Sequence, residues 1–309
     1  MTLREIRKFL FGAVETREEK GGLRAFPIPE KIRRIWGEKA DWLETHASFP
    51  TGVRLDLHTD APTVCFTLSG GTFTVALDGL FAGKWEAMEK TTFSLSLPAG
   101  DHRVTMWYPL HENGIVHDLT LPEGYSATPH AYDCSFLFLG DSITQGFCAE
   151  HDTCAFALQV SAACNADCLI QGVGGAYFNP DAFEKPEYFD PHRVIVAFGT
   201  NDPTWGFDGE TLRKQTGDYL EKLVAAFGPA KVLCILPIWR SENSLKEEIR
   251  GFYGECMAMI RQEAEKRDIP VVDGLTLVPH HPDYFAADCL HPNDRGFGAY
   301  ACNLLPYLF

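Results

Sequence analysis

Ser142 is the residue of this chain whose setting first suggests chemistry. It lies in FLFLGDSIT, residues 136–144, where an apolar run ends in a Gly-Asp pair directly before the hydroxyl. A serine hydroxyl is a weak nucleophile and needs a base within hydrogen-bonding reach. His291 can be that base, because imidazole exchanges protons near neutral pH. Asp288 lies three residues before His291, so in a turn both side chains can face one way and the carboxylate can orient the ring.

Each of these motifs also has a structural interpretation. Asp141 and Ser142 can turn the chain and cap a helix. Asp288 and His291 can be a surface cap and a solvated imidazole. For one motif taken alone the structural interpretation is favoured, so the chemical interpretation depends on whether the fold brings the motifs together.

The second half of the chain, residues 131–309, contains short apolar runs separated by longer helical patterns. Runs bounded by turns are typical of strands covered by helices on both faces, as in a parallel sheet. Helices are expected over 209–227 and 244–266. The prediction is a three-layer α/β/α domain with a parallel sheet of about five strands. The apolar runs are SFLFLG, DCLIQG, RVIVAFG, KVLCILP and DIPVVDG.

The first half, residues 1–130, has a different period. From about Val53 to Leu121 apolar and polar residues alternate, which marks half-buried strands, and no helical pattern interrupts them. Turn-forming residues at 69–71, 98–101 and 112–114 separate these strands, which predicts an antiparallel β-sandwich of the jelly-roll kind. Residues 1–50 are less legible, with a short helix near the start. The domain boundary is expected near 123–133.

The bulk properties exclude several classes of function. A net charge of −15 opposes binding to nucleic acids and to anionic lipid surfaces. No apolar run reaches bilayer-spanning length, and the first residues lack a signal-peptide core, so a cytoplasmic location is expected. The ten cysteines are scattered without disulfide or zinc spacing, so we expect free thiols, no structural metal and no cofactor.

Four polar or glycine-rich segments follow predicted strands or precede the last helix: GDSIT, GVGGAY, GTNDP and DCLHPN. In an open parallel sheet, loops at the carboxyl ends of strands share one rim. As an ordered set these blocks resemble the SGNH (GDSL) hydrolase superfamily, over roughly Tyr132 to Leu308. The resemblance implies a flavodoxin-like fold and a serine esterase with Ser142, His291 and Asp288 as its catalytic triad.

The resemblance also implies an oxyanion hole, a set of donors for the oxygen that becomes negative during acyl transfer. Its donors are the backbone N–H groups of Ser142 and Gly172 and the side-chain amide of Asn201, each worth about 3 kcal/mol. Two departures from the family pattern occur. Ile143 stands where the family name implies leucine, and Ile170 stands where many members have asparagine. Because of the departure at Ile170, Gly174 and Gly175 are alternatives to Gly172 as the glycine that donates to the oxyanion.

The substrate expected from these features is a small-molecule or carbohydrate ester. A β-sandwich ahead of an SGNH domain is similar in layout to some carbohydrate acetylesterases, which suggests hydrolysis of short acyl groups such as acetyl. Two alternatives remain: a lipolytic or thioester-cleaving acylhydrolase with the same triad, and a non-catalytic carbohydrate-binding protein. The oligomeric state stays open. Aromatic residues after strand ends are candidates for substrate contact, although such residues more often belong to the core: Trp205, Tyr177 and Trp239.

Overall fold

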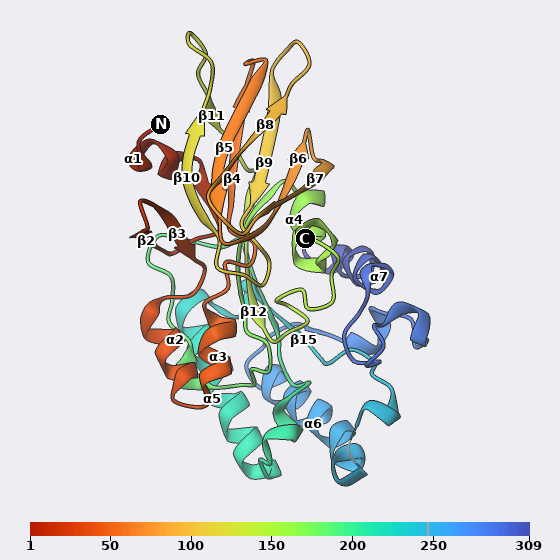
Figure 1. Ribbon diagram of the computed structural model, residues 1–309. Helices are drawn as coiled ribbons and strands as arrows, with labels where there is room; N and C mark the ends of the chain where they lie inside the picture. The colour runs from red at the N-terminus through yellow and green to blue at the C-terminus, as the bar shows by residue number, and fades with distance from the viewer. Residues whose placement is uncertain (246) are drawn as a thin grey trace.

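The computed structural model describes residues 1–245 and 247–309. It consists of an antiparallel β-sandwich and a parallel sheet covered by helices, with the sandwich at the top and the helical layers below (Figure 1). The predicted fold class is therefore confirmed.

The sandwich is built from two antiparallel sheets. A short helix, α1 (Leu3–Ile6), precedes it. One sheet has the order β1-β4-β9-β6-β7, with β11 paired to β4, and the other has the order β2-β3-β10-β5-β8. The first comprises β1 (Leu10–Phe11), β4 (Arg54–Thr59), β6 (Gly71–Leu77), β7 (Leu80–Ala87), β9 (His102–Trp107) and β11 (Thr128–Pro129). The second comprises β2 (Glu15–Glu19), β3 (Gly22–Phe26), β5 (Thr63–Ser69), β8 (Thr91–Ser96) and β10 (Ile115–Thr120).

The alternating residues of these strands form the sandwich core. In β5, for example, Val64, Phe66 and Leu68 are fully buried while the residues between them are partly exposed. Side chains on successive strand residues point to opposite faces, so one face of the sheet meets its partner and the other meets solvent. The alternation seen in the sequence is thus the pattern of a half-buried sheet.

The second unit is a five-stranded sheet in which every pairing is parallel, in the order β13-β12-β14-β15-β16. Its helices cover both faces, as expected, and α5 has the predicted bounds. The strands are β12 (Cys134–Gly140), β13 (Ala166–Gly172), β14 (Arg193–Ala197), β15 (Val232–Ile235) and β16 (Val271–Val272). The helices that follow the sandwich are α4 (Phe156–Ala163), α5 (Gly209–Phe227), α6 (Glu247–Glu265) and α7 (Asp294–Leu304).

Successive residues of the central strand β12 serve the two faces in turn. Phe136 and Phe138 belong to the core shared with α4 and α7. Leu137 and Leu139 belong to the opposite core, which α5 and α6 help to form. A strand buried on both faces has to be apolar throughout, which explains the continuous run FLFL in the sequence.

Two helices from the first 50 residues also cover the parallel sheet. They are α2 (Glu30–Gly37) and α3 (Asp41–Ala47), whose buried Ile32, Trp36 and Leu43 share the core of Leu137 and Leu139. Figure 1 shows both helices beside α5, below the sandwich. The domain boundary at residues 130 and 131 stays a prediction, and the packing shows that the N-terminal segment contributes to both cores.

A buried charged cluster joins the sandwich to the parallel sheet. The Arg54 guanidinium of β4 donates to the Asp167 carboxylate of β13 at 2.8 Å and to the Tyr132 hydroxyl at 2.8 Å. Asp56, fully buried, accepts two hydrogen bonds from Arg103 at 3.0 and 2.7 Å. A buried charge is costly unless an opposite charge or a hydrogen-bonding group lies beside it. Because the partners of Arg54 come from both units, the cluster fixes how the two units sit against each other.

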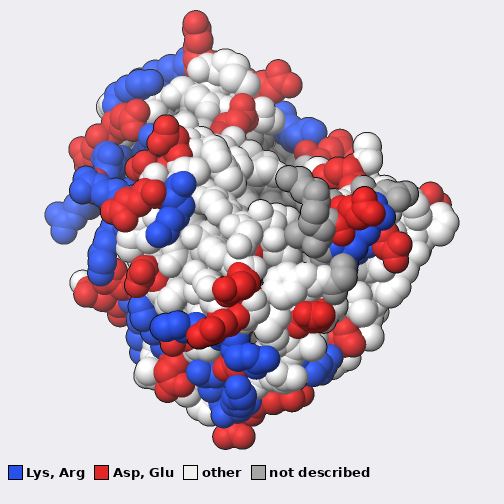
Figure 2. Space-filling model, turned by 90° about the horizontal axis from the view of Figure 1, so that it is seen from below, with Lys and Arg blue, Asp and Glu red and all other residues white. Residues whose placement is uncertain are grey.

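Charge is unevenly distributed over the end of the molecule that carries α5 and α6. Figure 2 shows a broad uncharged area on this face, with acidic side chains reaching its lower part and most charged residues toward the edges. Among the described residues, no helix combines the length and the apolar character needed to cross a bilayer.

Candidate active site

The loops at the carboxyl ends of the parallel strands carry most of the residues singled out in the sequence. Ser142 follows β12, Gly172 ends β13, and Asn201 follows β14. Asp288 and His291 lie in the loop that leads into α7. The parallel topology therefore gathers segments separated by up to 149 residues at one edge of the sheet.

Ser142, His291 and Asp288 form one line of hydrogen-bonding atoms. The Nε2 atom of His291 lies 2.7 Å from the Ser142 Oγ, and its Nδ1 atom lies 2.6 Å from an Asp288 carboxylate oxygen. Ser142 is 6% exposed, so its hydroxyl is largely shielded from bulk water. The arrangement lets the imidazole accept the serine proton on one nitrogen while the carboxylate binds the other.

Asp288 is held in its ionised form. Partial burial raises the pKa of its carboxyl, but hydrogen bonds from the His291 ring and from the backbone N–H groups of Leu290 and His291 outweigh burial and bring the pKa below its ordinary value. The two backbone bonds, at 2.9 and 3.0 Å, both go to Oδ1. Oδ2 is left for the imidazole, so one carboxylate both shapes its turn and orients the ring.

The serine loop is a tight turn organised by Asp141. Its carboxylate accepts the Ile143 N–H at 2.9 Å and its carbonyl accepts the Gln145 N–H at 2.9 Å. Burial raises the pKa of Asp141 to about 7. The side chain thus shapes this turn, one of the roles that its sequence position suggested, and in the described chain no helix begins there for it to cap.

The glycine-rich loop after β13 offers more than one candidate oxyanion donor. A Cβ atom on Gly172 would lie 2.6 Å from the Gln145 backbone nitrogen, so glycine there lets the serine loop pack against the strand end. Asn201 Nδ2 donates to the carbonyl of Ala176 at 3.0 Å, which places this amide beside Gly175. Gly175 has φ +83, a left-handed backbone conformation that favours glycine.

Helix α3 contributes residues to the site that the sequence pattern did not reveal. The Nδ1 atom of His46 lies 2.9 Å from the carbonyl oxygen of Gly174, and its ring packs edge-on against Phe147. Phe147 also stacks on the His291 ring, with centroids 5.8 Å apart. The helix is distant in sequence from the candidate catalytic motifs, so only tertiary packing brings it to the site.

Of the three aromatic residues predicted to contact substrate, Tyr177 and Trp205 pack against each other with centroids 5.0 Å apart, and Trp239 packs in a different loop. Trp205 is half-buried and donates from Nε1 to the Gly175 carbonyl at 3.0 Å, so it lies beside the glycine-rich loop. Tyr177 is 4% exposed and belongs to the core. Trp239 stacks on His280 in another loop. An unpredicted residue, Trp42, is 46% exposed and stacks on Trp205 with centroids 6.1 Å apart.

Cys148 has a thiol that could act as a second nucleophile, and it lies near Asp288 and His291. Its Sγ, an Asp288 oxygen and a His291 ring nitrogen all lie within 4.8 Å of one another. Partial burial, together with the negative charge of Asp288, raises the pKa of the Cys148 thiol. The thiol therefore stays protonated near neutral pH, whereas the Ser142 hydroxyl has the imidazole directly in line.

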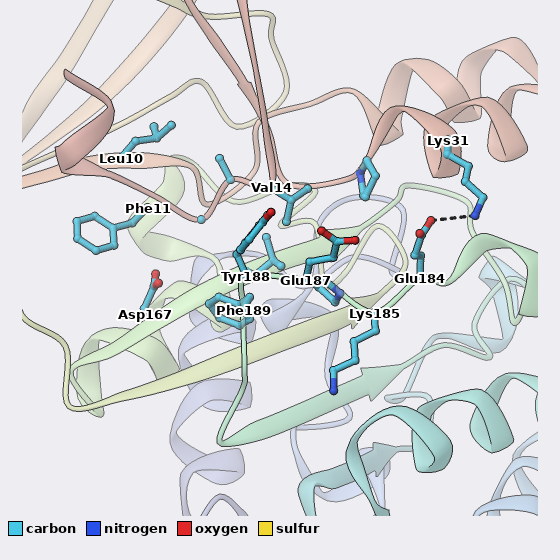
Figure 3. A pocket seen from close by; sticks show the side chains of 15 residues that line it. Leu10, Phe11, Val14, Lys31, Asp167, Glu184, Lys185, Glu187, Tyr188 and Phe189 are labelled. Carbon is cyan, nitrogen blue, oxygen red and sulfur yellow. Dashed lines mark hydrogen bonds and ion pairs between the residues drawn. The ribbon is translucent and has the colours of Figure 1, made fainter. Parts of the chain in front are cut away.

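A cavity of about 530 Å³ lies at the seam between the sandwich and the edge strand β13. Figure 3 shows Tyr188 and Phe189 near the centre of its lining, with Phe11 to the left of them and Val14 beside Tyr188. An ion pair between Lys31 and Glu184, 3.1 Å apart, stands at its margin. Neither Ser142 nor His291 nor Asp288 lines this cavity, so it is separate from the candidate catalytic atoms.

A smaller cavity, of about 230 Å³, lies between the sandwich and the segment that follows Cys148. We call it the polar cavity, because most of its lining can hydrogen bond: Thr72, Thr74, Lys84, Leu110, His111, Glu112, Ala149, Glu150, His151 and Asp152. The His111 ring packs on Phe147 with centroids 4.4 Å apart, and Phe147 packs on His291. The polar cavity therefore adjoins the candidate catalytic residues on the side of the sandwich.

Comparison with known proteins identifies the family of this chain. The model of the GDSL-like Lipase/Acylhydrolase family matches residues 138–299, which include the serine, glycine, asparagine and histidine segments. The chain belongs to this family. The predicted SGNH (GDSL) membership is thus confirmed, and the protein is a GDSL-type acylhydrolase, a carboxylic ester hydrolase. No curated protein sequence matches the chain.

Solved structures similar to this acylhydrolase share its whole architecture at low sequence identity. One is the salicylyl-acyltransferase SsfX3 from a tetracycline biosynthetic pathway, with TM-score 0.79, 16% identity and 95% and 92% of the two chains covered. A family two carbohydrate esterase from Cellvibrio japonicus has TM-score 0.72, 17% identity and coverage of 97% and 94%. The acetyl xylan esterase Est2A from Butyrivibrio proteoclasticus has TM-score 0.65, 15% identity and coverage of 97% and 94%. These likenesses establish the fold.

Proposed function

We propose that this GDSL-type acylhydrolase is a serine esterase that removes short acyl groups, acetyl foremost, from carbohydrate esters. The observation that carries the proposal is the line from the Ser142 Oγ through the His291 imidazole to the Asp288 carboxylate, with separations of 2.7 and 2.6 Å. A weak nucleophile, a base with suitable proton affinity and an orienting anion are what acyl transfer through serine requires.

In the first step the Ser142 Oγ attacks the ester carbonyl carbon and its proton passes to His291 Nε2. The resulting imidazolium is stabilised by the ionised Asp288. The tetrahedral intermediate collapses when His291 returns this proton to the leaving alcohol oxygen, which leaves an acyl-serine. Water then attacks the acyl-serine while His291 takes its proton, and His291 returns that proton to the Ser142 Oγ as the acid product leaves.

The developing oxyanion needs donors on the side away from His291. We assign this role to the Ser142 N–H, the Asn201 side-chain amide and one glycine N–H. Asn201 uses one amide hydrogen on Ala176, at 3.0 Å, and retains a second for the substrate oxygen. Gly172 is the donor implied by the family resemblance, and the position of Asn201 favours Gly175. Each donor can lower the barrier by about 3 kcal/mol.

A short acyl group and a polar alcohol fit the surroundings of the serine. Aromatic rings of Phe147 and the Trp42–Trp205 pair flank the loops around Ser142, while the 530 Å³ cavity lies elsewhere. Sugars bind proteins through stacking on aromatic rings and hydrogen bonds to polar side chains, which these tryptophans and the polar cavity can offer. Two of the similar structures are carbohydrate esterases, one of them an acetyl xylan esterase.

The first experiment compares wild type with Ser142→Ala on p-nitrophenyl acetate. We expect activity in the wild type and a loss of about 10³-fold or more in the variant. Equal rates in both proteins would refute the proposed role of Ser142 as nucleophile. A fluorophosphonate probe that labels wild type and spares Ser142→Ala would identify the nucleophile directly, and it would exclude a purely carbohydrate-binding role.

A second experiment decides between substrate classes. Acyl nitrophenyl esters from acetyl to octanoyl are compared, followed by a series of acetylated mono- and oligosaccharides. Rates that fall with chain length, together with release of acetate from sugars, support the carbohydrate acetylesterase. Rates that rise toward octanoyl would favour a lipolytic or thioester-cleaving enzyme with the same triad.

A further inference from the structure

We propose that Cys148, Asp288 and His291 form an inhibitory binding site for Zn²⁺, through which the metal switches off the esterase reversibly. Zinc binding to these residues stands on their geometry alone, and only its inhibitory consequence rests on the proposed function. The site differs from the structural zinc sites considered in the sequence, because two of its ligands, His291 and Asp288, belong to the proposed catalytic triad.

The three side chains bring together the ligand types that zinc prefers. A thiolate sulfur, an imidazole nitrogen and a carboxylate oxygen each bind Zn²⁺ at about 2.0–2.3 Å, and three protein ligands leave a fourth position for water. The donor atoms of Cys148, Asp288 and His291 already lie within 4.8 Å of one another. The Cys148 side chain is exposed, so a small rotation can bring its sulfur to bonding distance.

The backbone that carries Cys148 and the carboxylate of Asp288 are both held in place by hydrogen bonds. Cys148 lies in the turn that begins at Ser142, where the Phe147 N–H donates to the Ser142 carbonyl at 2.9 Å and the Ala149 N–H to the Gly146 carbonyl at 3.1 Å. The Asp288 carboxylate is fixed by two backbone N–H groups. Metal binding then requires only the Cys148 side chain to change its rotamer, while its backbone and the Asp288 carboxylate are already in place.

Zinc bound here would disable the catalytic base whichever ring nitrogen it takes. Coordination through Nε2 occupies the lone pair that would accept the Ser142 proton. Coordination through Nδ1 replaces the hydrogen bond to Asp288, which is 2.6 Å long in the free protein. In either case the Cys148 S–H bond breaks, its proton goes to solvent, and a sulfur–zinc bond forms without any change of oxidation state.

Metal binding is measured on the full chain carrying Ser142→Ala, which keeps all three ligands and is independent of catalysis. After chelator treatment, calorimetric titration with Zn²⁺ should show one site, and Cd²⁺ should produce an ultraviolet thiolate charge-transfer band. Adding Cys148→Ser should weaken Zn²⁺ binding by about 10–100-fold and remove that band. Cys302→Ser, which alters another exposed thiol, is the matched control and should change neither.

Inhibition is measured on the active enzyme with p-nitrophenyl acetate. Zn²⁺ should inhibit wild type and Cys302→Ser alike, a chelator should restore the rate, and Cys148→Ser should keep its metal-free rate while resisting the metal. Equal Zn²⁺ affinity with and without Cys148 would overturn the site. Binding that depends on Cys148 but leaves hydrolysis unaffected would overturn the inhibitory role, and inactivity without metal would instead count against the proposed esterase function.

Discussion

The side-chain amide of Gln145 holds the backbone of Gly174: Gln145 Oε1 accepts the Gly174 N–H at 2.6 Å. On its other side, Gln145 Nε2 donates to the His46 carbonyl at 2.7 Å. Gln145 is 1% exposed and lies three residues after Ser142, so one buried side chain fastens the serine loop, the glycine-rich loop and helix α3 together. Positioning of this kind is sensitive to displacements of about 1 Å.

Replacing Gln145 should therefore reduce the chemical step more than substrate binding. For Gln145→Leu we expect kcat on p-nitrophenyl acetate to fall by about 10–100-fold, with KM changed by less than about threefold. The control is Gln262→Leu, because Gln262 contacts Arg213 on the helical surface away from the loops. A rise in KM with kcat unchanged would show that Gln145 shapes binding and does not position the loops.

Asn201→Ala tests the oxyanion assignment. The variant loses a donor to the oxyanion and the hydrogen bond to Ala176, so we expect kcat to fall by about 10²–10³-fold. Asn303→Ala is the matched control, since Asn303 also donates to a backbone carbonyl, that of Leu277, on a different part of the surface. If both variants lose activity equally, the amide at position 201 has no special role toward the oxyanion.

Asp288→Asn separates the charge of this residue from its role in the turn. The asparagine oxygen can still accept the Leu290 and His291 N–H groups, but the negative charge beside the imidazolium is lost. We expect kcat to fall by about 10²–10⁴-fold while thermal unfolding changes little. An active Asp288→Asn enzyme would remove the carboxylate from the mechanism.

The polar cavity can be tested by comparing two exposed ion pairs. Lys84 and Glu150, 3.6 Å apart, line this cavity, whereas Lys31 and Glu184, 3.1 Å apart, stand at the margin of the 530 Å³ cavity. If the polar cavity binds the sugar, Lys84→Ala and Glu150→Ala should raise KM for an acetylated sugar several-fold and leave p-nitrophenyl acetate unaffected. The Lys31→Ala and Glu184→Ala pair should change neither. If instead Lys31→Ala and Glu184→Ala raise KM for the acetylated sugar and the other two variants do not, the sugar binds at the larger cavity.

The sequence predicts those features of the structure that depend on residues near one another in the chain, and it does not predict those that depend on packing between distant segments. Helix α5 has the expected bounds because Asp208 caps its first turn and Gly228, at positive φ, ends it. The apolar runs could be recognised because a strand buried on both faces has to be apolar throughout. Trp42 and His46 could not be assigned, because nothing in the sequence of α3 says that it packs beside the glycine-rich loop. The choice between Gly172 and Gly175 likewise depends on where Asn201 lies, which only the folded loops decide.

The polar cavity also contains a buried acid that should make stability depend on pH. Asp152 is 1% exposed, and its carboxylate accepts a hydrogen bond from the Thr74 hydroxyl at 2.8 Å. Burial raises the pKa of Asp152 from 3.8 to about 7. Between these values the folded state binds a proton that the unfolded state has lost, so the free energy of unfolding falls as pH rises from about 4 to about 7 and this loss is complete above pH 7.

Asp152→Asn removes this titration and keeps an acceptor for Thr74. Relative to wild type, the variant should gain stability by up to about 1.4 kcal/mol for each pH unit across this window. Urea unfolding of both proteins at pH 5 and pH 8 measures the difference, which should be larger at pH 8. Asp60→Asn, at an exposed position, is the control and should show no such trend. A difference between Asp152→Asn and wild type that is equal at both pH values would mean that Asp152 is already ionised at pH 5 in the folded protein.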